Sequence, residues 1–115
     1  MRANEFDNPT VNDIKDVAEW LDTTPNNLTI EIIEEPIQKF INQITEMYQT
    51  YDEFPKDAKR TRNIIKSIKQ TGKLYPIYVE KNDPHLFVME GRHRMVAFWL
   101  LKLNRSPVAY VSIKI

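Results

Sequence analysis

The sequence contains only two glycines, Gly72 and Gly91, and each stands where a regular element ends or begins. A helix is predicted from about Lys56 to Gln70, and a glycine directly after it takes the left-handed conformation that closes the last turn. Between the two glycines lie two strand-like runs, "LYPIYVE" and "HLFVME", separated by the turn residues "KNDP". Gly91 then precedes an apolar helix that reaches Leu103. The two glycines therefore indicate the order helix, strand, strand, helix.

Hydrophobic spacing predicts the remaining elements. Apolar residues recur at helical spacing from Val11 to Leu21, where Thr10 and Asp13 resemble a capping box. The runs "LTIEIIE" and "SPVAYVSIKI" predict two further strands. Pro36 suits the first turn of a helix, and a stripe of apolar and aromatic residues follows it. The stripe consists of Ile37, Phe40, Ile41, Ile44, Met47, Tyr48 and Tyr51. These elements predict an α/β (α+β) fold with helices packed on a small mixed sheet.

The composition limits the kinds of protein that this chain can form. With 115 residues, 42% of them hydrophobic, it suits one compact domain. We expect residues 28–115 to form that domain and residues 1–27 to form an acidic helical extension. The absence of cysteine excludes disulfides, cysteine zinc sites and thiol nucleophiles. Because no apolar run of about 18 residues and no signal-like N-terminus occur, we expect no membrane partner and a cytoplasmic location.

Charge is strongly segregated along the sequence, although the net charge is zero. Residues 1–54 hold 3 Lys and Arg against 12 Asp and Glu, a net of −9, whereas residues 55–115 hold 13 against 4, a net of +9. Such an asymmetry favours an anionic partner for the basic half. Two alternatives stay open: the acidic helices pack beside the basic ones and neutralise them, or both faces are simply solvated.

The stretch "MEGRHR" has the composition of an anion-binding turn. Gly91 allows a tight turn and the close approach of a ligand, and the first N–H groups of the following helix are free to bind an anion. Arg92 and Arg94 would add charge-assisted hydrogen bonds to phosphate oxygens, and His93 would donate a hydrogen bond or act as an acid or base. Cations are disfavoured at a helix N-terminus. The alternative is therefore that the arginines pair with Glu90 or with the acidic N-terminal helices.

The helix expected before Gly72 carries a basic stripe. Its Lys and Arg residues recur at i, i+3, i+7, i+10 and i+14, and no acidic residue occurs from Ala58 to Val79. The stripe consists of Lys59, Arg62, Lys66, Lys69 and Lys73. A continuous basic stripe attracts a nucleic-acid backbone through counterion release, while the alternative is a solvated lysine face.

The spacing of the potential metal ligands indicates no metal site. His85 and His93 could join Asp83 or Glu90 around a hard metal ion, but this spacing matches no familiar ligand set. The sequence also lacks a P-loop, a dinucleotide fingerprint and a nucleophile paired with a base.

One long stretch, "SIKQTGKLYPIYVEKNDPHLFVMEGRHRMVAFWLLKLNRSPVAYV", resembles the ParB/sulfiredoxin superfamily. The shared pattern is a helix, a glycine, a "Pro-Ile" strand, a second strand, a Gly-x-His/Arg-Arg turn, an alanine-containing helix and a final "Pro-Val" strand. The resemblance is tight over Ser67 to Val111 and extends back to Leu28 in element order. It implies a ParB/sulfiredoxin-like fold for residues 28–115.

The resemblance also implies roles for particular residues. In the family, the turn that matches Gly91, His93 and Arg94 binds nucleotide phosphates, and the preceding helix contributes polar residues to the same ligand. By position these would be Ser67, Asn63 and Arg60. Sulfiredoxins carry their catalytic cysteine at the position of Arg92, so we expect the sulfiredoxin reaction to be absent.

Partition proteins of the ParB type continue into a helix-turn-helix domain and a dimerisation domain, whereas this sequence ends directly after its last predicted strand. We therefore expect a small stand-alone ParB-like domain of the sort carried by bacteriophages, often labelled "ParB-like nuclease". Its location would be the cytoplasm, including that of a phage-infected host.

Three functions follow from these features. The first is a module that binds the phosphates of a nucleotide or a nucleic acid through the Gly-x-His-Arg turn and the basic stripe. The second is an enzyme on the same site, a Mg²⁺-dependent nucleotide hydrolase, phosphotransferase or nuclease. It would use a nucleoside triphosphate with Mg²⁺, Glu90 or His93 as the catalytic base, and Arg94 to stabilise charge. The third is a protein-interaction domain or homodimer that uses the acidic N-terminal half.

Overall fold

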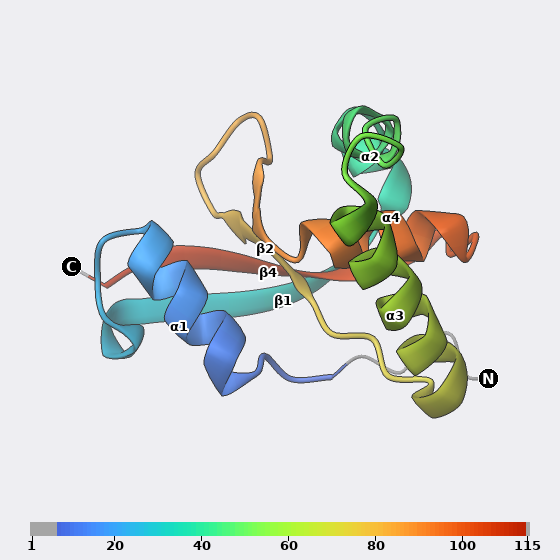
Figure 1. The fold of residues 1–115 in the computed structure, drawn as a ribbon. Helices are drawn as coiled ribbons and strands as arrows, with labels where there is room; N and C mark the ends of the chain where they lie inside the picture. Colours follow the sequence, from blue (N-terminus) through green and yellow to red (C-terminus); the bar gives the residue numbers. More distant parts are fainter. Residues whose placement is uncertain (1–6, 115) are drawn as a thin grey trace.

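The structure, a computed structural model, describes residues 7–114 and has a mixed α+β fold (Figure 1). Its helices are α1 (Val11–Trp20), α2 (Ile41–Tyr48), α3 (Pro55–Thr71) and α4 (Arg92–Leu100). Its strands are β1 (Leu28–Pro36), β2 (Ile77–Glu80), β3 (Val88–Glu90) and β4 (Arg105–Ile113). Two short 3₁₀ helices, Pro25–Asn27 and Ile37–Phe40, precede β1 and α2. The α+β class and the mixed sheet that the sequence predicted are thereby confirmed.

The four strands form one sheet in the order β1-β4-β2-β3. β4 pairs antiparallel with β1 along its whole length, from Leu28 opposite Ile113 to Pro36 opposite Arg105. On its other side β4 pairs parallel with β2, and β2 pairs antiparallel with β3. The strand that comes last in the sequence is therefore central, and β1 lies at an edge.

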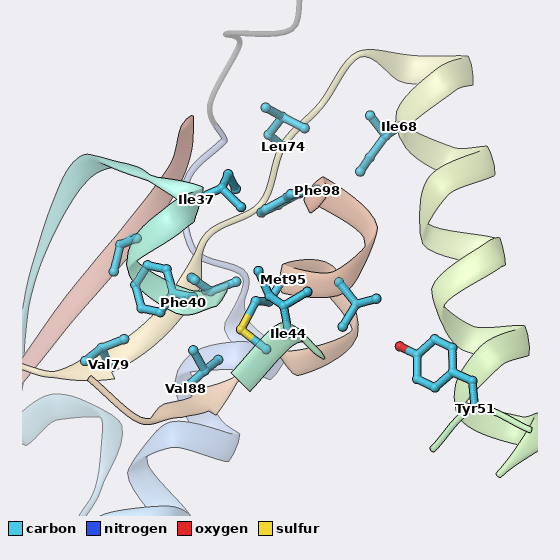
Figure 2. Packing of buried hydrophobic residues seen from close by; sticks show 13 residues of the cluster. Ile37, Phe40, Ile44, Tyr51, Ile68, Leu74, Val79, Val88, Met95 and Phe98 are labelled. Atoms are coloured by element: carbon cyan, nitrogen blue, oxygen red, sulfur yellow. The ribbon is translucent and has the colours of Figure 1, made fainter. Parts of the chain in front are cut away.

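Side chains alternate between the two faces of the sheet, and each face has its own apolar core. Val108 of β4 and Ile77 of β2 face the larger core. Ile44 of α2, Ile68 of α3 and Phe98 of α4 complete this core (Figure 2). Ala109 of β4 and Tyr78 of β2 face the smaller core, which α1 covers with Val17. In Figure 1, α1 accordingly lies over one end of the long β1–β4 pair, and α2, α3 and α4 gather at the other end.

Helix α4 is apolar on almost every side because other elements surround it. Met95, Val96, Ala97 and Phe98 are all buried, and α4 contacts β2 as well as α2 and α3. A helix in such a position needs no polar face along most of its length. Its charged residues are confined to its first turn.

Helix α1 begins as the sequence predicted. The Thr10 hydroxyl accepts a hydrogen bond from the Asp13 backbone N–H at 3.1 Å, which confirms Thr10 as the N-cap. The Asp13 carboxylate binds Arg94 and the Tyr78 hydroxyl instead of completing the predicted capping box. The helix then packs on the sheet through Val17 and Ala18, both 1% exposed. Residues 7–27 of the predicted extension are thus packed onto the rest of the fold.

The segment after Pro36 differs from the single long helix that the spacing predicted. The Ile37 N–H still donates to the Asn104 carbonyl at 2.9 Å, so the chain stays tied to the start of β4 and leaves the sheet as a 3₁₀ helix. Helix α2 follows and ends at Tyr48. Most of the predicted stripe is buried or half-buried, but Tyr48 is 43% exposed.

The two strands between the glycines are shorter than their apolar runs. The Asp83 carboxylate accepts hydrogen bonds from the backbone N–H groups of His85 at 2.9 Å and Phe87 at 3.0 Å, and it holds this stretch as a loop. Leu86 within the loop has a φ of 52°, in the left-handed region. As a result β3 is limited to Val88–Glu90. The start of β2 has a separate cause: the strand begins only after Pro76, which has no N–H to donate.

Candidate functional site

The turn between β3 and α4 is built around Gly91. Its φ is 92°, a conformation that favours glycine. A Cβ atom at this position would lie 3.1 Å from the Ile77 Cα atom in β2. Both the backbone conformation and the neighbouring strand therefore require glycine here. The sequence associated Gly91 with the close approach of a ligand, and in the structure the atoms that approach it belong to β2.

Arg94, which is partly exposed, forms an ion pair with the buried Asp13 of α1. Its Nη1 lies 2.7 Å from Asp13 Oδ2 and its Nη2 lies 3.0 Å from Asp13 Oδ1, while Nη1 also donates to the Pro76 carbonyl at 3.0 Å. The Tyr78 hydroxyl donates to the same carboxylate at 3.1 Å, and burial, followed by the Asp13 charge, raises the pKa of Tyr78. Because Asp13 is only 5% exposed, this network joins α1, β2 and α4 inside the fold.

The other two basic residues of the turn also have partners. His93 Nε2 lies 2.9 Å from Asp57 Oδ1, at the start of α3. The Arg92 guanidinium carbon lies 5.2 Å from the centre of the Phe87 ring, within the range of a cation–π contact. Arg92 also lines a cavity of about 300 Å³ together with Asp57 and residues of α2 and the turn after it. The positive charge at the start of α4 is thus offset by two carboxylates and an aromatic ring.

Glu90, the last residue of β3, is half-buried beside this turn. Burial raises the pKa of its carboxyl group above the ordinary value, and the nearby charges of Asp16 and Asp13 raise it further, while Arg94 acts in the opposite direction. A carboxyl group with a raised pKa is suited to exchange protons closer to neutral pH. Within residues 7–114, no group of three or more His, Asp or Glu side chains is placed to hold a metal ion.

The basic stripe is present on α3 and continues to the residue after its C-terminal glycine. All its members are exposed, and none forms an ion pair with a residue in the described range 7–114. We call these five residues the basic surface: Lys59, Arg62, Lys66, Lys69 and Lys73. The opposite side of α3 is buried through Thr61 and Ile68. The one acidic residue of α3, Asp57, lies at His93 instead of on this surface.

Arg60, Asn63 and Ser67 are also exposed on α3. A turn of 3.6 residues places Arg60 and Ser67 on a different side of the helix from Arg62, whereas Asn63, between Lys59 and Lys66, borders the basic stripe. None of their side chains hydrogen bonds to another residue in the part of the chain that the structure describes. They are therefore free to meet a ligand, although nothing in their contacts ties them to the Gly91 turn.

A second group of residues was not singled out in the sequence. Helix α2, the turn after it, α3 and the end of α4 line a partly open cavity of about 760 Å³. Its lining includes Tyr51, which is 9% exposed and belongs to the larger core, and Tyr48, which is 43% exposed although it falls in the same helical stripe. Arg62 of the basic surface lines the same cavity.

The sequence named the acidic N-terminal helices as an alternative partner of the arginines, and the Asp13–Arg94 ion pair confirms this alternative without the particular residue having been predicted. Asp13 was interpreted as part of a helix cap, and the local pattern gave no signal that its carboxylate would meet a residue 81 positions away. The negative net charge of the first half was the only indication that an acidic helix could serve this purpose.

Comparison with known proteins finds no family model that matches the sequence, and no similar curated protein or solved structure. The ParB/sulfiredoxin resemblance therefore stays a prediction. No helix in residues 7–114 is long and apolar enough to cross a membrane.

Proposed function

We propose that the protein is a nucleic-acid-binding module that holds a phosphate backbone on the basic surface of α3. One observation carries this proposal: the five cations of that surface are exposed and have no ion-pair partner within residues 7–114. By contrast, Arg94 and His93 of the α4 turn are already paired with carboxylates. The structure thus distinguishes cations that stabilise the fold from cations available to a ligand.

The dimensions of the basic surface suit an extended backbone. With a rise of 1.5 Å per residue, Lys59 and Lys69 are separated by ~15 Å along the helix axis, which is enough for several phosphates. Each neutralised phosphate releases counterions, so the affinity should fall steeply with salt. Contacts of this kind carry no sequence information, and we expect little dependence on base sequence from this surface alone.

The α4 turn would add a second contact in this proposal. The resemblance to ParB-like domains supports phosphate binding there, and the first N–H groups of α4 have no partner inside the helix. With Arg94 and His93 paired, Arg92 is the cation of the turn without a carboxylate partner in the described residues. A nucleotide or a DNA phosphate would bind to Arg92 and these N–H groups. Arg60, Asn63 and Ser67 of α3 would contribute further polar contacts to the same ligand.

The test is a binding titration of labelled single-stranded and duplex DNA, followed by fluorescence anisotropy at several salt concentrations. We expect the Lys59→Glu/Lys66→Glu variant to lose at least about tenfold in affinity at low salt, because it removes two favourable phosphate contacts and adds two repulsive charges. The matched control is Lys81→Glu/Lys114→Glu, which makes the same charge change at exposed lysines outside the basic surface. An equal loss in both variants would contradict a binding site on α3.

A phosphoryl-transfer enzyme at the α4 turn is a second candidate, and Glu90 is the observation that favours it. Its half-buried position and raised pKa suit a general base next to a phosphate-binding turn. A nucleoside triphosphate with Mg²⁺ would be the substrate and cofactor. Release of phosphate, or nicking of a plasmid, should then be lost in Glu90→Gln. Binding without turnover in the wild type would leave the protein a binding module.

The edge strand β1 is the feature that supports the third function, a protein-interaction domain. Ile32 and Ile33 are 37% and 39% exposed there, between the acidic residues Glu31 and Glu34. Charges on an edge strand discourage pairing with a like strand, so a second copy or another protein would have to supply cations. We place the protein in the cytoplasm, including that of a phage-infected host, where nucleic acid is accessible.

A further inference from the structure

The cavity beside the basic surface has a wall suited to a flat, partly polar ligand. It measures about 760 Å³ and lies between α2, the turn after it, α3 and the C-terminal end of α4. Aromatic and aliphatic side chains form one part of the wall, and polar side chains form the other. The residues that matter here are Tyr48, Tyr51 and Leu100 in the first part and Gln49, Asp52 and Arg62 in the second.

Arg62 connects this cavity to the basic surface. It belongs to the row of exposed cations on α3 and also lines the cavity. A strand whose phosphates contact Lys59, Arg62 and Lys66 therefore passes directly beside the cavity. One of its bases is then close enough to enter.

Tyr48 offers a preformed platform for that base. Its ring lies edge-on to the rings of Tyr51 and Trp99, with centroid distances of 5.5 Å and 5.4 Å. These contacts restrict the ring, yet Tyr48 remains 43% exposed. A partly exposed ring that is restricted by two aromatic neighbours loses little conformational freedom when a base stacks on it.

The rest of the wall suits the edge of a base. The Tyr51 hydroxyl is already used, because it lies 2.5 Å from the Thr61 hydroxyl. Gln49 and Asp52 are exposed, and neither side chain hydrogen bonds to another residue in the described range 7–114. An amide and a carboxylate can accept the N–H groups that every base presents on its edge. The pattern of an aromatic platform, polar edge groups and an adjacent cation is typical of single-strand recognition.

We propose that this cavity binds one unpaired nucleobase, stacked on Tyr48, of a single strand held on the basic surface. The proposal rests on the function proposed above and names its substrate class. Bases in a duplex are already paired and stacked, and they cannot enter a cavity without leaving the helix. Single-stranded nucleic acid is therefore the expected ligand.

The experiment separates the base contact from the phosphate contact. Affinities are measured for an oligothymidylate of about 15 nucleotides and for an abasic strand of the same length, which has the same phosphates but no bases. We expect the wild type to bind the oligothymidylate roughly tenfold more tightly. Tyr48→Ala should remove this preference and leave the affinity for the abasic strand unchanged. Trp20→Ala, an exposed aromatic residue of α1 outside the cavity, is the control and should keep the preference.

A second measurement keeps the test decisive if Tyr48→Ala does not fold. The sequence has two tryptophans, so Trp20→Phe leaves Trp99, which contacts Tyr48, as the only one. Its fluorescence should change on addition of oligothymidylate and stay constant with the abasic strand. No change with either strand, although both bind, would overturn the proposal.

The outcomes distinguish this proposal from the one on which it rests. Equal affinity for the two strands would overturn the base cavity while leaving the basic surface intact. The same conclusion would follow if a folded Tyr48→Ala variant kept the preference for bases. Failure of the wild type to bind either strand would overturn both proposals.

Discussion

At the residue scale, a single carboxylate organises the contacts at the start of α4. Asp13 accepts two hydrogen bonds from Arg94 and one from the Tyr78 hydroxyl. A buried carboxylate is tolerated only when such partners satisfy it, and the partly exposed guanidinium of Arg94 supplies two of the three hydrogen bonds. The pair therefore acts as one unit, and removing either member leaves an uncompensated charge inside the fold.

We expect Arg94→Met to lower the free energy of unfolding by about 3 kcal/mol, since Asp13 would stay buried without its cation. Urea denaturation followed by circular dichroism measures the change. The double variant Arg94→Met/Asp13→Asn should recover a large part of the loss, because it removes both charges and keeps an acceptor for Tyr78. If the double variant were as unstable as the sum of the two single variants, Arg94 would stabilise the fold by packing alone.

Glu90 should make the stability depend on pH. Burial and the neighbouring carboxylates raise the pKa of Glu90, so the native state retains a proton that the unfolded chain has already released. This stabilisation is present below the ordinary glutamate pKa of about 4.3 and is lost as the pH rises through the native value. We expect Glu90→Gln to be more stable than the wild type at about pH 7 and similar to it at about pH 4.

Urea denaturation at the two pH values tests this expectation. Glu80→Gln is the matched control, because Glu80 is an exposed glutamate of the adjacent strand β2. A stability difference for Glu90→Gln that did not vary with pH would contradict a raised pKa.

At the scale of the elements, the sequence predicted an element's end correctly where the cause of that end lies in the same stretch of chain. Helix α3 ends where a glycine was expected to stop it, since Gly72 has a φ of 71° and its N–H bonds to the Ile68 carbonyl. The helix after Pro36 was predicted less well, because its start depends on a hydrogen bond to Asn104 at the beginning of β4. The loop before β3 was predicted as a strand because its sequence is an apolar run. Its conformation depends on one carboxylate, that of Asp83, which accepts hydrogen bonds from two backbone N–H groups.

The same distinction applies to the candidate site. The sequence located the Gly91 turn and the basic surface, because glycine placement and helical spacing are visible in one stretch of chain. It could not show that Arg94 is paired while Lys66 is free, since that depends on which elements become neighbours. The cavity at Tyr48 was invisible for the same reason.

At the scale of the whole molecule, the segregation of charge in the sequence persists in three dimensions. Only two ion pairs in residues 7–114 join the acidic first half to the basic second half, Asp13–Arg94 and Glu34–Arg105. Helix α1 covers one face of the sheet, while α3 belongs to the core on the other face. Although Asp52 of the first half lines the same cavity as Arg62, no residue of the basic surface forms an ion pair within residues 7–114, which is the condition that the proposed binding of nucleic acid requires.

The central position of β4 also affects how the chain folds during its synthesis. Within residues 7–114, β1 pairs only with β4, and β4 alone joins β1 to the β2–β3 pair. Until Arg105–Ile113 has left the ribosome, β1 lacks its partner and its apolar residues stay open to solvent and to chaperones. Helix α3, closed by its own glycine, can form earlier. The sheet is thus completed only after translation of nearly the whole described chain.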